Sequence, residues 1–315
     1  MGGSVLITGG AGFIGSHVAE AYLEAGWSVT CLDDLSRGKR EQVPDAARFV
    51  EADVRSDAAF AAIADGRFDL LIHQAAQIDV RVSVDSPALD ASINLVGFTN
   101  VLAAAAAGKV ARVIFASSGG VVYGDPVRIP TRETEPNLPI SPYGVSKLAG
   151  EHYLRALGAL RGFEGVALRY ANVYGPRQDP KSEAGVVSIF VSRVLAGEPL
   201  TIFGDGNQTR DYVYVKDVAR ANLLAASASV SRGDRLDVPA FNIATGRETS
   251  VNQLAEFVGR ALGHRPEIVH APARAGELAR SCLDVSKAAR ELGWTPEVSF
   301  DDGVKALAKW FQAAA

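Results

Sequence analysis

The chain has 315 residues, 48% of them hydrophobic and 22% charged, which is the composition of a globular protein with one large or two ordinary domains. Its net charge of −4 argues against an extended nucleic-acid-binding surface, although a local basic pocket for one phosphorylated ligand stays open. The two cysteines, Cys31 and Cys282, lack metal-site spacing, so we expect free thiols in a reducing cytoplasm and no bound metal. We expect no signal peptide and no membrane partner, because residues 4–8 already predict a strand and no apolar run approaches the ~18 residues of a membrane span.

Strands and helices alternate along the first half of the chain. Apolar runs predict strands at residues 4–8, 28–32, 48–50, 69–73, 112–116 and 166–169. Helices are predicted between them, at residues 14–25, 58–64, 89–107 and 142–160. This alternation indicates crossover connections and a parallel sheet, and strands that are apolar throughout indicate a sheet covered on both faces. The predicted fold class is therefore α/β, a Rossmann-type doubly wound parallel sheet with a smaller mixed α/β substrate-binding domain.

The regular alternation ends near Tyr174. Residues 175–180, Gly-Pro-Arg-Gln-Asp-Pro, predict a loop, and short mixed elements follow it. Two later stretches, 217–228 and 241–244, are regular enough to return to the first sheet. We predict a Rossmann domain of residues 1–174, rejoined by 212–246, and a second, ligand-binding domain of residues 175–211 and 247–315.

A glycine-rich turn joins the first predicted strand to the first helix. Gly9, Gly12 and Gly15 have the spacing G-x-x-G-x-x-G between these elements, which is the context that a dinucleotide-binding loop needs. The first glycine permits the tight turn, the second lets the backbone approach a pyrophosphate, and the third lets the helix pack closely. The helix N-terminus adds free N–H groups and a positive dipole. The turn predicts a bound dinucleotide, with Phe13 and Ile14 beside its phosphates.

Acidic residues at the next strand ends indicate which dinucleotide binds. Asp33 can accept a hydrogen bond from a ribose 2′-hydroxyl and would repel a 2′-phosphate. It therefore favours NAD over NADP, against a milder opposite signal from Arg37. Asp53, with Val54 beside it, either contacts the adenine amino group or simply caps the end of the third strand.

A tyrosine and a lysine form the second chemical motif. Ser141 is a good N-cap and Pro142 suits the first helical position, so Tyr143 and Lys147 lie four residues apart on one helix face. A nearby ammonium and the helix N-terminus are expected to lower the tyrosine pKa from its ordinary value of about 10. A Y-x-x-x-K pair alone is usually structural. Together with the glycine loop it predicts a general base that acts on a sugar or alcohol hydroxyl.

These motifs together resemble the extended short-chain dehydrogenases/reductases, in the branch of nucleotide-sugar epimerases and dehydratases, and most of all the UDP-glucose 4-epimerases. The resemblance spans essentially the whole chain and is carried by residues 8–15, 73–76, 117–124, 143–147, 168–177, 205–217 and 272–283. It implies an NAD cofactor held by further residues beyond the glycine loop. These residues are Ala75, Ala76, Gln77, Asn94, Tyr143, Lys147 and Tyr170, and His73 matches the start of the family's loop after the fourth strand.

One catalytic position departs from the family pattern. The family carries a third catalytic hydroxyl shortly before its Val-Tyr-Gly motif, and here that position is Gly119. Ser118 is the nearest substitute and would hydrogen-bond the reacting hydroxyl. Ser117 is the other candidate, and its alternative role is a hydrogen bond at the strand end.

The resemblance also implies a nucleotide-sugar site. Arg210 and Arg274 match the family's diphosphate arginines, whose guanidinium groups suit phosphate geometry. Glu277 matches an acidic ribose contact that is often aspartate, and Ser281 matches a gatekeeper whose small size would leave room for an N-acetylhexosamine. The remaining implied contacts are Asn172 to the diphosphate and Val187 and Phe203 to the uracil, the last two equally consistent with core packing.

The implied reaction is NAD-dependent 4-epimerisation of a UDP-sugar through a transient 4-keto intermediate, with Tyr143 as the base. The substrate would be UDP-glucose or UDP-galactose, with UDP-N-acetylhexosamine also open. A dehydratase would need carboxylates where Gly119-Gly120-Val121 stands, whereas a UDP-glucuronate epimerase or decarboxylase stays open through Arg177 and Lys181. A non-catalytic NAD-binding sensor is disfavoured because the tyrosine and lysine are both present. The family also implies a homodimer through helices 89–107 and 141–160.

Overall fold

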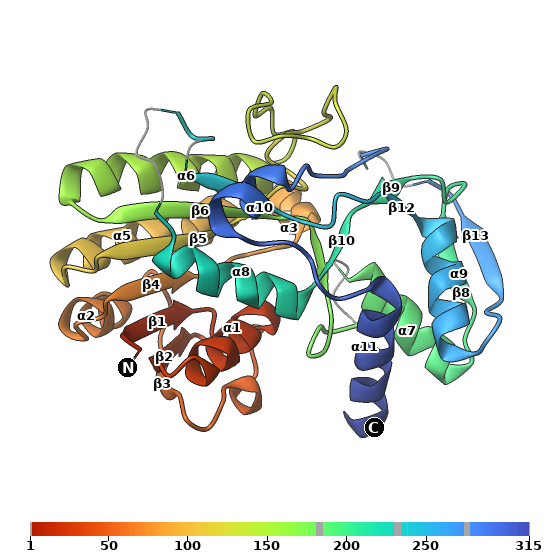
Figure 1. Ribbon diagram of the computed structural model, residues 1–315, viewed down its shortest axis with the longest axis horizontal. Coiled ribbons are helices and arrows are strands. Elements are labelled where there is room, and N and C mark those ends of the chain that lie inside the picture. Colours follow the sequence, from red (N-terminus) through yellow and green to blue (C-terminus); the bar gives the residue numbers. More distant parts are fainter. Residues whose placement is uncertain (1, 181–184, 230–234, 238, 274–277, 315) are drawn as a thin grey trace.

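The computed structural model describes residues 2–180, 185–229, 235–237, 239–273 and 278–314 (Figure 1). A seven-stranded parallel sheet with the order β11-β6-β5-β4-β1-β2-β3 forms the left side of the molecule in Figure 1. Its strands are β1 (Ser4–Thr8), β2 (Ser28–Asp33), β3 (Arg48–Glu51), β4 (Leu70–His73), β5 (Arg112–Ser118), β6 (Glu164–Tyr170) and β11 (Ala240–Ile243). The strand order reverses between β1 and β4, and ligands of such sheets bind at the carboxyl ends of the strands at this point. The predicted fold class is confirmed.

Helices cover both faces of the sheet, which explains why its strands are apolar throughout. Val5 and Ile7 of β1 belong to the core beneath α1 (Phe13–Glu24) and α8 (Val215–Ser227). Leu6 points the other way, into the core beneath α2 (Asp57–Asp65) and α5 (Phe98–Ala107). The long helix α6 (Pro142–Arg161) covers β5 and β6, and η1 (Arg40–Gln42) lies in the loop after β2.

The second half of the chain has an apolar core of its own, on the right in Figure 1. Three helices enclose it: α7 (Val186–Ala196), α9 (Val251–Leu262) and α11 (Phe300–Ala314). Short strand pairs complete it: β8 (Leu200–Phe203) with β13 (Ile268–Ala271), β9 (Thr209–Arg210) with β12 (Thr249–Ser250), and β7 (Asn172–Tyr174) with β10 (Tyr212–Tyr214). One helix of the range 247–315, α10 (Ser286–Leu292), packs instead against β11 and α8. The predicted division into two domains stays a proposal.

The helix predicted at residues 89–107 is longer and less regular than expected. It follows α3 (Val80–Asp85) and runs from α4 (Pro87–Ala91) through a π-helical turn, η2 (Ser92–Gly97), into α5. Tertiary contacts explain the turn, because η2 carries a hydrogen-bonded amide, Asn94, and ends at Gly97, where a Cβ would lie 2.7 Å from Val54 Cγ2. The turn is typical of functional sites.

The same helical run corrects the expectation that no apolar stretch approaches the length of a membrane span. Pro87–Ala107 has 21 residues and is, by length and composition alone, apolar enough to cross a membrane. Within the fold, 44% of its most apolar window is buried. Its second half, α5, packs against α2 and α6. The buried apolar residues of α5 therefore belong to the protein core, whereas Leu89 and Val96 earlier in the run are exposed.

Candidate active site

Two glycines of the β1–α1 turn are required by sterics. Gly9 has φ of +69°, and a Cβ there would lie 2.6 Å from the backbone nitrogen of Ala75. A Cβ on Gly15 would lie 2.1 Å from the carbonyl oxygen of Gly9. Gly12 is the N-cap of α1 and supplies no side-chain cap, so the N–H groups of the helix's first turn, which begins with Phe13 and Ile14, are available to a ligand. This bare, positively polarised turn fits the diphosphate of the predicted NAD.

Asp33 stands beside this cradle at the end of β2. Its carboxylate accepts hydrogen bonds from the backbone nitrogens of Ala11, at 3.0 Å, and Leu35, at 2.9 Å. Burial raises the pKa of Asp33, and the two backbone donors oppose that rise. The side chain is thus fixed next to the glycine turn, where the predicted ribose contact would lie. Arg37 is exposed in the loop that follows.

Asp53 takes a different role from Asp33. It lies beyond the end of β3 and holds Arg55, whose Nε is 2.9 Å from Asp53 Oδ1, and this hydrogen bond lowers the pKa of the carboxyl group. The buried Val54 between them accepts a hydrogen bond through its carbonyl oxygen from Asn100 Nδ2 at 2.9 Å. These contacts favour the capping interpretation of Asp53, and its adenine contact stays a prediction.

The loop after β4 is held by the amide of Asn94. Asn94 Nδ2 donates to the carbonyl oxygen of Gln77 at 2.9 Å, and Asn94 Oδ1 accepts from the Gln77 backbone nitrogen at 2.9 Å. At the start of the same loop, Thr8 Oγ1 lies 2.8 Å from His73 Nδ1 and accepts from the backbone nitrogen of Ala75 at 3.4 Å. Ala75 and Ala76 are only partly buried. Together these bonds carry the loop across the edge of the sheet beside the glycine turn.

Tyr170 ends β6 on the same side of the sheet. Its hydroxyl oxygen accepts hydrogen bonds from Gln74 Nε2 at 2.9 Å and Asn222 Nδ2 at 2.8 Å. Burial raises the pKa of Tyr170 to about 12, so the phenol stays neutral. The hydroxyl is engaged inside the protein, and its predicted contact to the nicotinamide ribose stays a prediction.

Tyr143 and Lys147 lie at the start of α6, as predicted. Ser141 Oγ caps the helix by accepting from the backbone nitrogen of Gly144 at 3.2 Å. The Lys147 ammonium donates to the carbonyl oxygen of Ala116 at 2.9 Å and lies 5.6 Å from the ring centroid of Tyr143. Burial lowers the pKa of Lys147 to about 8, while Asp90 opposes that shift.

The sequence predicted a lowered pKa for Tyr143, and this prediction is wrong for the protein without ligands. Burial raises the pKa of Tyr143, and the carboxylate of Asp90 raises it further. Burial disfavours the charged phenolate, and the Lys147 ammonium, 5.6 Å from the centre of the ring, does not offset this effect on the pKa. Further positive charge at the site would therefore have to accompany proton removal from this phenol.

The two serines at the end of β5 face different surroundings. Ser117 is buried, and its hydroxyl donates to Glu151 Oε1 at 2.5 Å, so it has the strand-end role and does not face the site. Ser118 is partly exposed at the last position of the strand, paired with Tyr170 of β6. Gly119 follows, and a Cβ there would lie 2.3 Å from Leu283 Cδ1, so a side chain at this position would require Leu283 to move.

The predicted substrate residues are distributed along β7 to β9 and the segment before α10. Arg210 is anchored by its Nη1, which donates to the carbonyl oxygens of Thr209 and Leu278, both at 2.8 Å. Ser281 is buried nearby, and its backbone nitrogen donates to the carbonyl oxygen of Thr209 at 3.2 Å. Asn172 and the buried Val187 line one small pocket. Phe203 ends β8 and is half-buried, whereas Arg274 and Glu277 lie outside the described residues.

Sequence reasoning missed several buried carboxylates around this site. Asp211 accepts hydrogen bonds from Thr245, Gly246 and Leu283, and burial raises its pKa. Asp90 and Glu151 are equally enclosed, with 0% and 3% exposure. The residues that precede and follow these carboxylates in the sequence do not reveal their partners.

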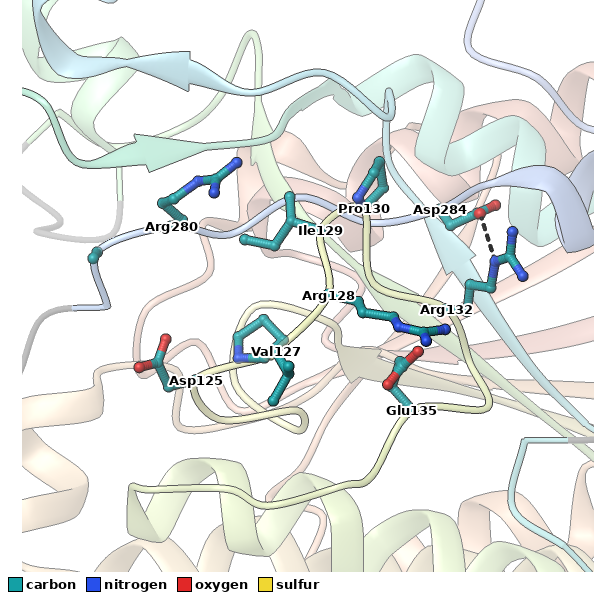
Figure 2. Close-up of a pocket in the computed structure, with 11 residues that line it drawn as sticks. Asp125, Val127, Arg128, Ile129, Pro130, Arg132, Glu135, Arg280 and Asp284 are labelled. Carbon is teal, nitrogen blue, oxygen red and sulfur yellow. Dashed lines mark hydrogen bonds and ion pairs between the residues drawn. The ribbon is translucent and has the colours of Figure 1, made fainter.

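A separate hollow of about 590 Å³ opens between the loop 125–135 and the segment 279–284 (Figure 2). Arg132 Nε lies 3.2 Å from Asp284 Oδ2 across one end of it. Its lining mixes three arginines with three carboxylates and includes none of the predicted site residues. The hollow is therefore distinct from the site around Tyr143.

Comparison with known proteins agrees with this geometry. A model described as the NAD dependent epimerase/dehydratase family matches residues 5–244. The UDP-glucose 4-epimerase of Mycolicibacterium smegmatis is 42% identical over 312 residues, with 98% of each chain covered. Two solved structures are also similar: UDP-glucose 4-epimerase from Thermotoga maritima with UDP-glucose (45% identity, TM-score 0.93, 99% of both chains) and from Thermus thermophilus with NAD (44%, 0.92, 99% of this chain and 100% of the other). The predicted resemblance is confirmed, and the chain belongs to the NAD-dependent epimerase/dehydratase family.

Proposed function

We propose that this protein is an enzyme that interconverts the 4-epimers of a UDP-sugar, UDP-glucose and UDP-galactose foremost, with NAD as a resident cofactor. One observation carries the proposal: a dinucleotide cradle at the start of α1 and a Tyr143–Lys147 pair at the start of α6 meet at the same edge of one parallel sheet. Relatives of known structure bind NAD and UDP-glucose, which supports the same assignment.

The glycine turn would hold the NAD diphosphate, Asp33 the adenosine ribose, and Lys147 the nicotinamide ribose. NAD, when bound, would supply the acceptor for a hydride from sugar carbon 4 and, once reduced, the donor that returns the hydride to the opposite face. Tyr143 Oη takes the proton of the 4-hydroxyl and later gives it back. The positively charged nicotinamide and the Lys147 ammonium together favour the phenolate that burial and Asp90 disfavour. Ser118 would orient the reacting hydroxyl, and Arg210 with Arg274 would hold the UDP diphosphate.

Three details bear on the choice of sugar and reaction. Ser281 is small, so an N-acetylhexosamine is a second candidate substrate. Arg177 is already paired with Glu20, which weakens the case for a uronate-binding arginine at this position. The stretch Gly119-Gly120-Val121 supplies no carboxylate for dehydration. The sequence and structure therefore favour a neutral hexose over the uronate and dehydratase alternatives.

The test is incubation of the purified protein with UDP-glucose, UDP-N-acetylglucosamine and UDP-glucuronate, followed by chromatographic separation of the 4-epimers. We expect UDP-galactose from the first substrate. Tyr143→Phe should retain NAD and lose nearly all turnover, because the ring stays and the base is lost. The absence of a 4-epimer from all three substrates would overturn the proposal, and normal turnover by Tyr143→Phe would refute the assignment of the base.

We also propose that the protein is a cytoplasmic homodimer that serves galactose metabolism. In each subunit, residues 1–174 and 212–246 would bind NAD, and residues 175–211 and 247–315 would bind the nucleotide-sugar. Support for the dimer comes from exposed apolar side chains on the mutually packed helices α3, α4, η2 and α6. These are Val84, Leu89, Val96, Val145 and Tyr153, each 44% exposed or more. Sedimentation of the wild-type protein should give a dimer, and the double variant Val84→Glu, Val145→Glu should be a monomer. A monomeric wild-type protein would contradict the proposed homodimer.

A further inference from the structure

Asp90 is a fully buried carboxylate beside the proposed catalytic pair, and sequence analysis assigned it no role. It lies in α4 with 0% exposure. Its Oδ2 accepts from Ser146 Oγ at 2.6 Å, and its Oδ1 accepts from Asn94 Nδ2 at 2.8 Å and Gln77 Nε2 at 3.1 Å. All three donors are neutral. A carboxylate away from water needs such donors, and a cation nearby stabilises it further.

The three donors are themselves parts of the site. Asn94 and Gln77 form the loop that is expected to contact NAD. Ser146 precedes Lys147 on α6, so its bond to Asp90 fixes the turn of helix that carries the ammonium. One carboxylate thus joins α4, the π-helical turn, the loop after β4 and the catalytic helix.

Lys147 is the cation that responds to this carboxylate. Asp90 raises the pKa of Lys147 against the effect of burial, and it also raises the pKa of Tyr143. His73 of β4 faces Lys147 from the sheet, and burial, with the lysine charge adding to it, lowers the pKa of His73 to about 3. His73 is therefore neutral at physiological pH and does not compete for the carboxylate.

Two further carboxylates near these elements, Asp79 and Glu151, are paired with arginines. On α3 and the preceding loop, Asp79 Oδ2 lies 3.4 Å from Arg81 Nη2. On α6, the next turn after Lys147 carries Glu151, which pairs with Arg169 at 2.7 Å. Asp90 is thus the carboxylate, among the described residues, whose charge acts on Lys147 and Tyr143 together.

We infer that Asp90 is a positioning residue: it aligns Ser146, Asn94 and Gln77 around the cofactor site and holds a negative charge at Ser146, where it favours the ammonium form of the adjacent Lys147. The inference rests on the proposed function only for the catalytic meaning of the pair. Loss of the Asp90 carboxylate makes deprotonation easier for both Tyr143 and Lys147. The whole pH–rate profile should then move toward lower pH.

The first experiment measures Lys147 directly, without NAD or substrate. Lysine labelled with ¹³C at Cε is titrated by NMR, and the Lys147 signal is assigned with Lys147→Arg. We expect Asp90→Asn to lower the Lys147 midpoint by about one pH unit, because removing a nearby opposite charge shifts a pKa by about that much. Ser146→Ala is the matched control, since it removes one hydrogen bond and keeps the charge. An unchanged midpoint in Asp90→Asn, or an equal shift in Ser146→Ala, would overturn the inference.

A relocated carboxylate keeps the test decisive if Asp90→Asn does not fold. The double variant Asp90→Ser, Ser146→Asp exchanges the two side chains that meet at 2.6 Å, so that the carboxylate lies on α6 and the hydroxyl on α4. It should restore the wild-type titration midpoint of Lys147. A midpoint well below the wild-type value in the exchange variant contradicts the inference. In folded variants that turn over substrate, both limbs of the kcat/KM profile should move to lower pH, and a lower rate with unmoved limbs would indicate a purely structural role. A wrong substrate assignment leaves the NMR result intact, so the two failures are distinguishable.

Discussion

Ser117 and Ser118 at the end of β5 point to opposite sides because successive side chains of a strand alternate. Ser118→Ala should lower kcat by about 10²-fold, since it removes a hydroxyl beside the proposed base. Ser117→Ala should instead lower the free energy of unfolding by about 1–3 kcal/mol, because Glu151 loses a buried donor. Steady-state kinetics and urea unfolding separate the two effects. A large loss of kcat in Ser117→Ala alone would reverse the assignment.

The glycines of the β1–α1 turn allow a second test at the residue scale. Gly12→Ala should fold, because its Cβ would lie 3.2 Å from the nearest atom, the carbonyl oxygen of Gly9. The same Cβ should block the approach of the diphosphate, so we expect the variant to release NAD. Gly15→Ala should unfold more easily, because its Cβ would lie 2.1 Å from the same oxygen. NAD retained after gel filtration and thermal unfolding measure the two outcomes. Full NAD retention by Gly12→Ala contradicts the cradle.

Residues that act through local geometry were predictable from the sequence, and residues that act through distant partners were not. The glycine turn and the Tyr143–Lys147 pair each need only a strand–helix junction or one helix face. Ser117 and Asp90 depend on partners 34 and 56 residues away, Glu151 and Ser146. Nothing in the local pattern distinguishes Ser117 from Ser118 until α6 is placed against β5.

At the scale of elements, a buried ion pair joins the catalytic helix to the sheet. Arg169 of β6 is fully buried and lies 2.7 Å from Glu151 of α6. Arg169→Met should cost about 3–5 kcal/mol of unfolding free energy, because it leaves an uncompensated buried carboxylate. Adding Glu151→Leu should recover most of that loss, as measured by urea unfolding. Equal losses in the single and double variants would show that the charge is not the cause.

The strands were predicted closely, and the helix before β5 was not. The inner strands of the sheet are covered on both faces, and the predicted strands match the observed ends within two residues. The π-helical turn at Ser92–Gly97 leaves no such pattern, because it depends on Asn94 reaching Gln77 and on Gly97 meeting Val54. Those contacts exist only after the layers pack together.

At the scale of the whole molecule, polar contacts join the cofactor helix to the segment that leads into the second core. In α1, His17 Nε2 lies 3.0 Å from the carbonyl oxygen of Pro176 and Nδ1 lies 3.5 Å from Glu20. Glu20 also pairs with Arg177, whose backbone has a φ of +70°. Helix α1 and the loop at residues 175–178 are therefore held together by charge as well as by packing.

This contact gives a pH prediction with a defined sign. Burial alone would raise the pKa of Glu20, but its contacts with His17 and Arg177 outweigh burial and lower the pKa from 4.5 to about 2. A carboxyl group whose folded pKa lies below its unfolded value stabilises the fold above about 4.5 and loses that contribution as pH falls toward 2. Glu20 is partly exposed, so solvent screening limits the contribution to below about 1 kcal/mol.

Glu20→Gln should consequently lower the unfolding free energy at pH 7 and leave it nearly equal to wild type near pH 2. The exposed Glu24→Gln, on the same helix, makes the same change in net charge without the pairing and serves as the control. Urea unfolding at pH 7, 4 and 2 measures the difference between the variants. If Glu20→Gln and Glu24→Gln lost equal stability at every pH, the contact between α1 and residues 175–178 would not be the source. A loss specific to Glu20 that disappears in acid would show that this contact couples the cofactor helix to the rest of the molecule.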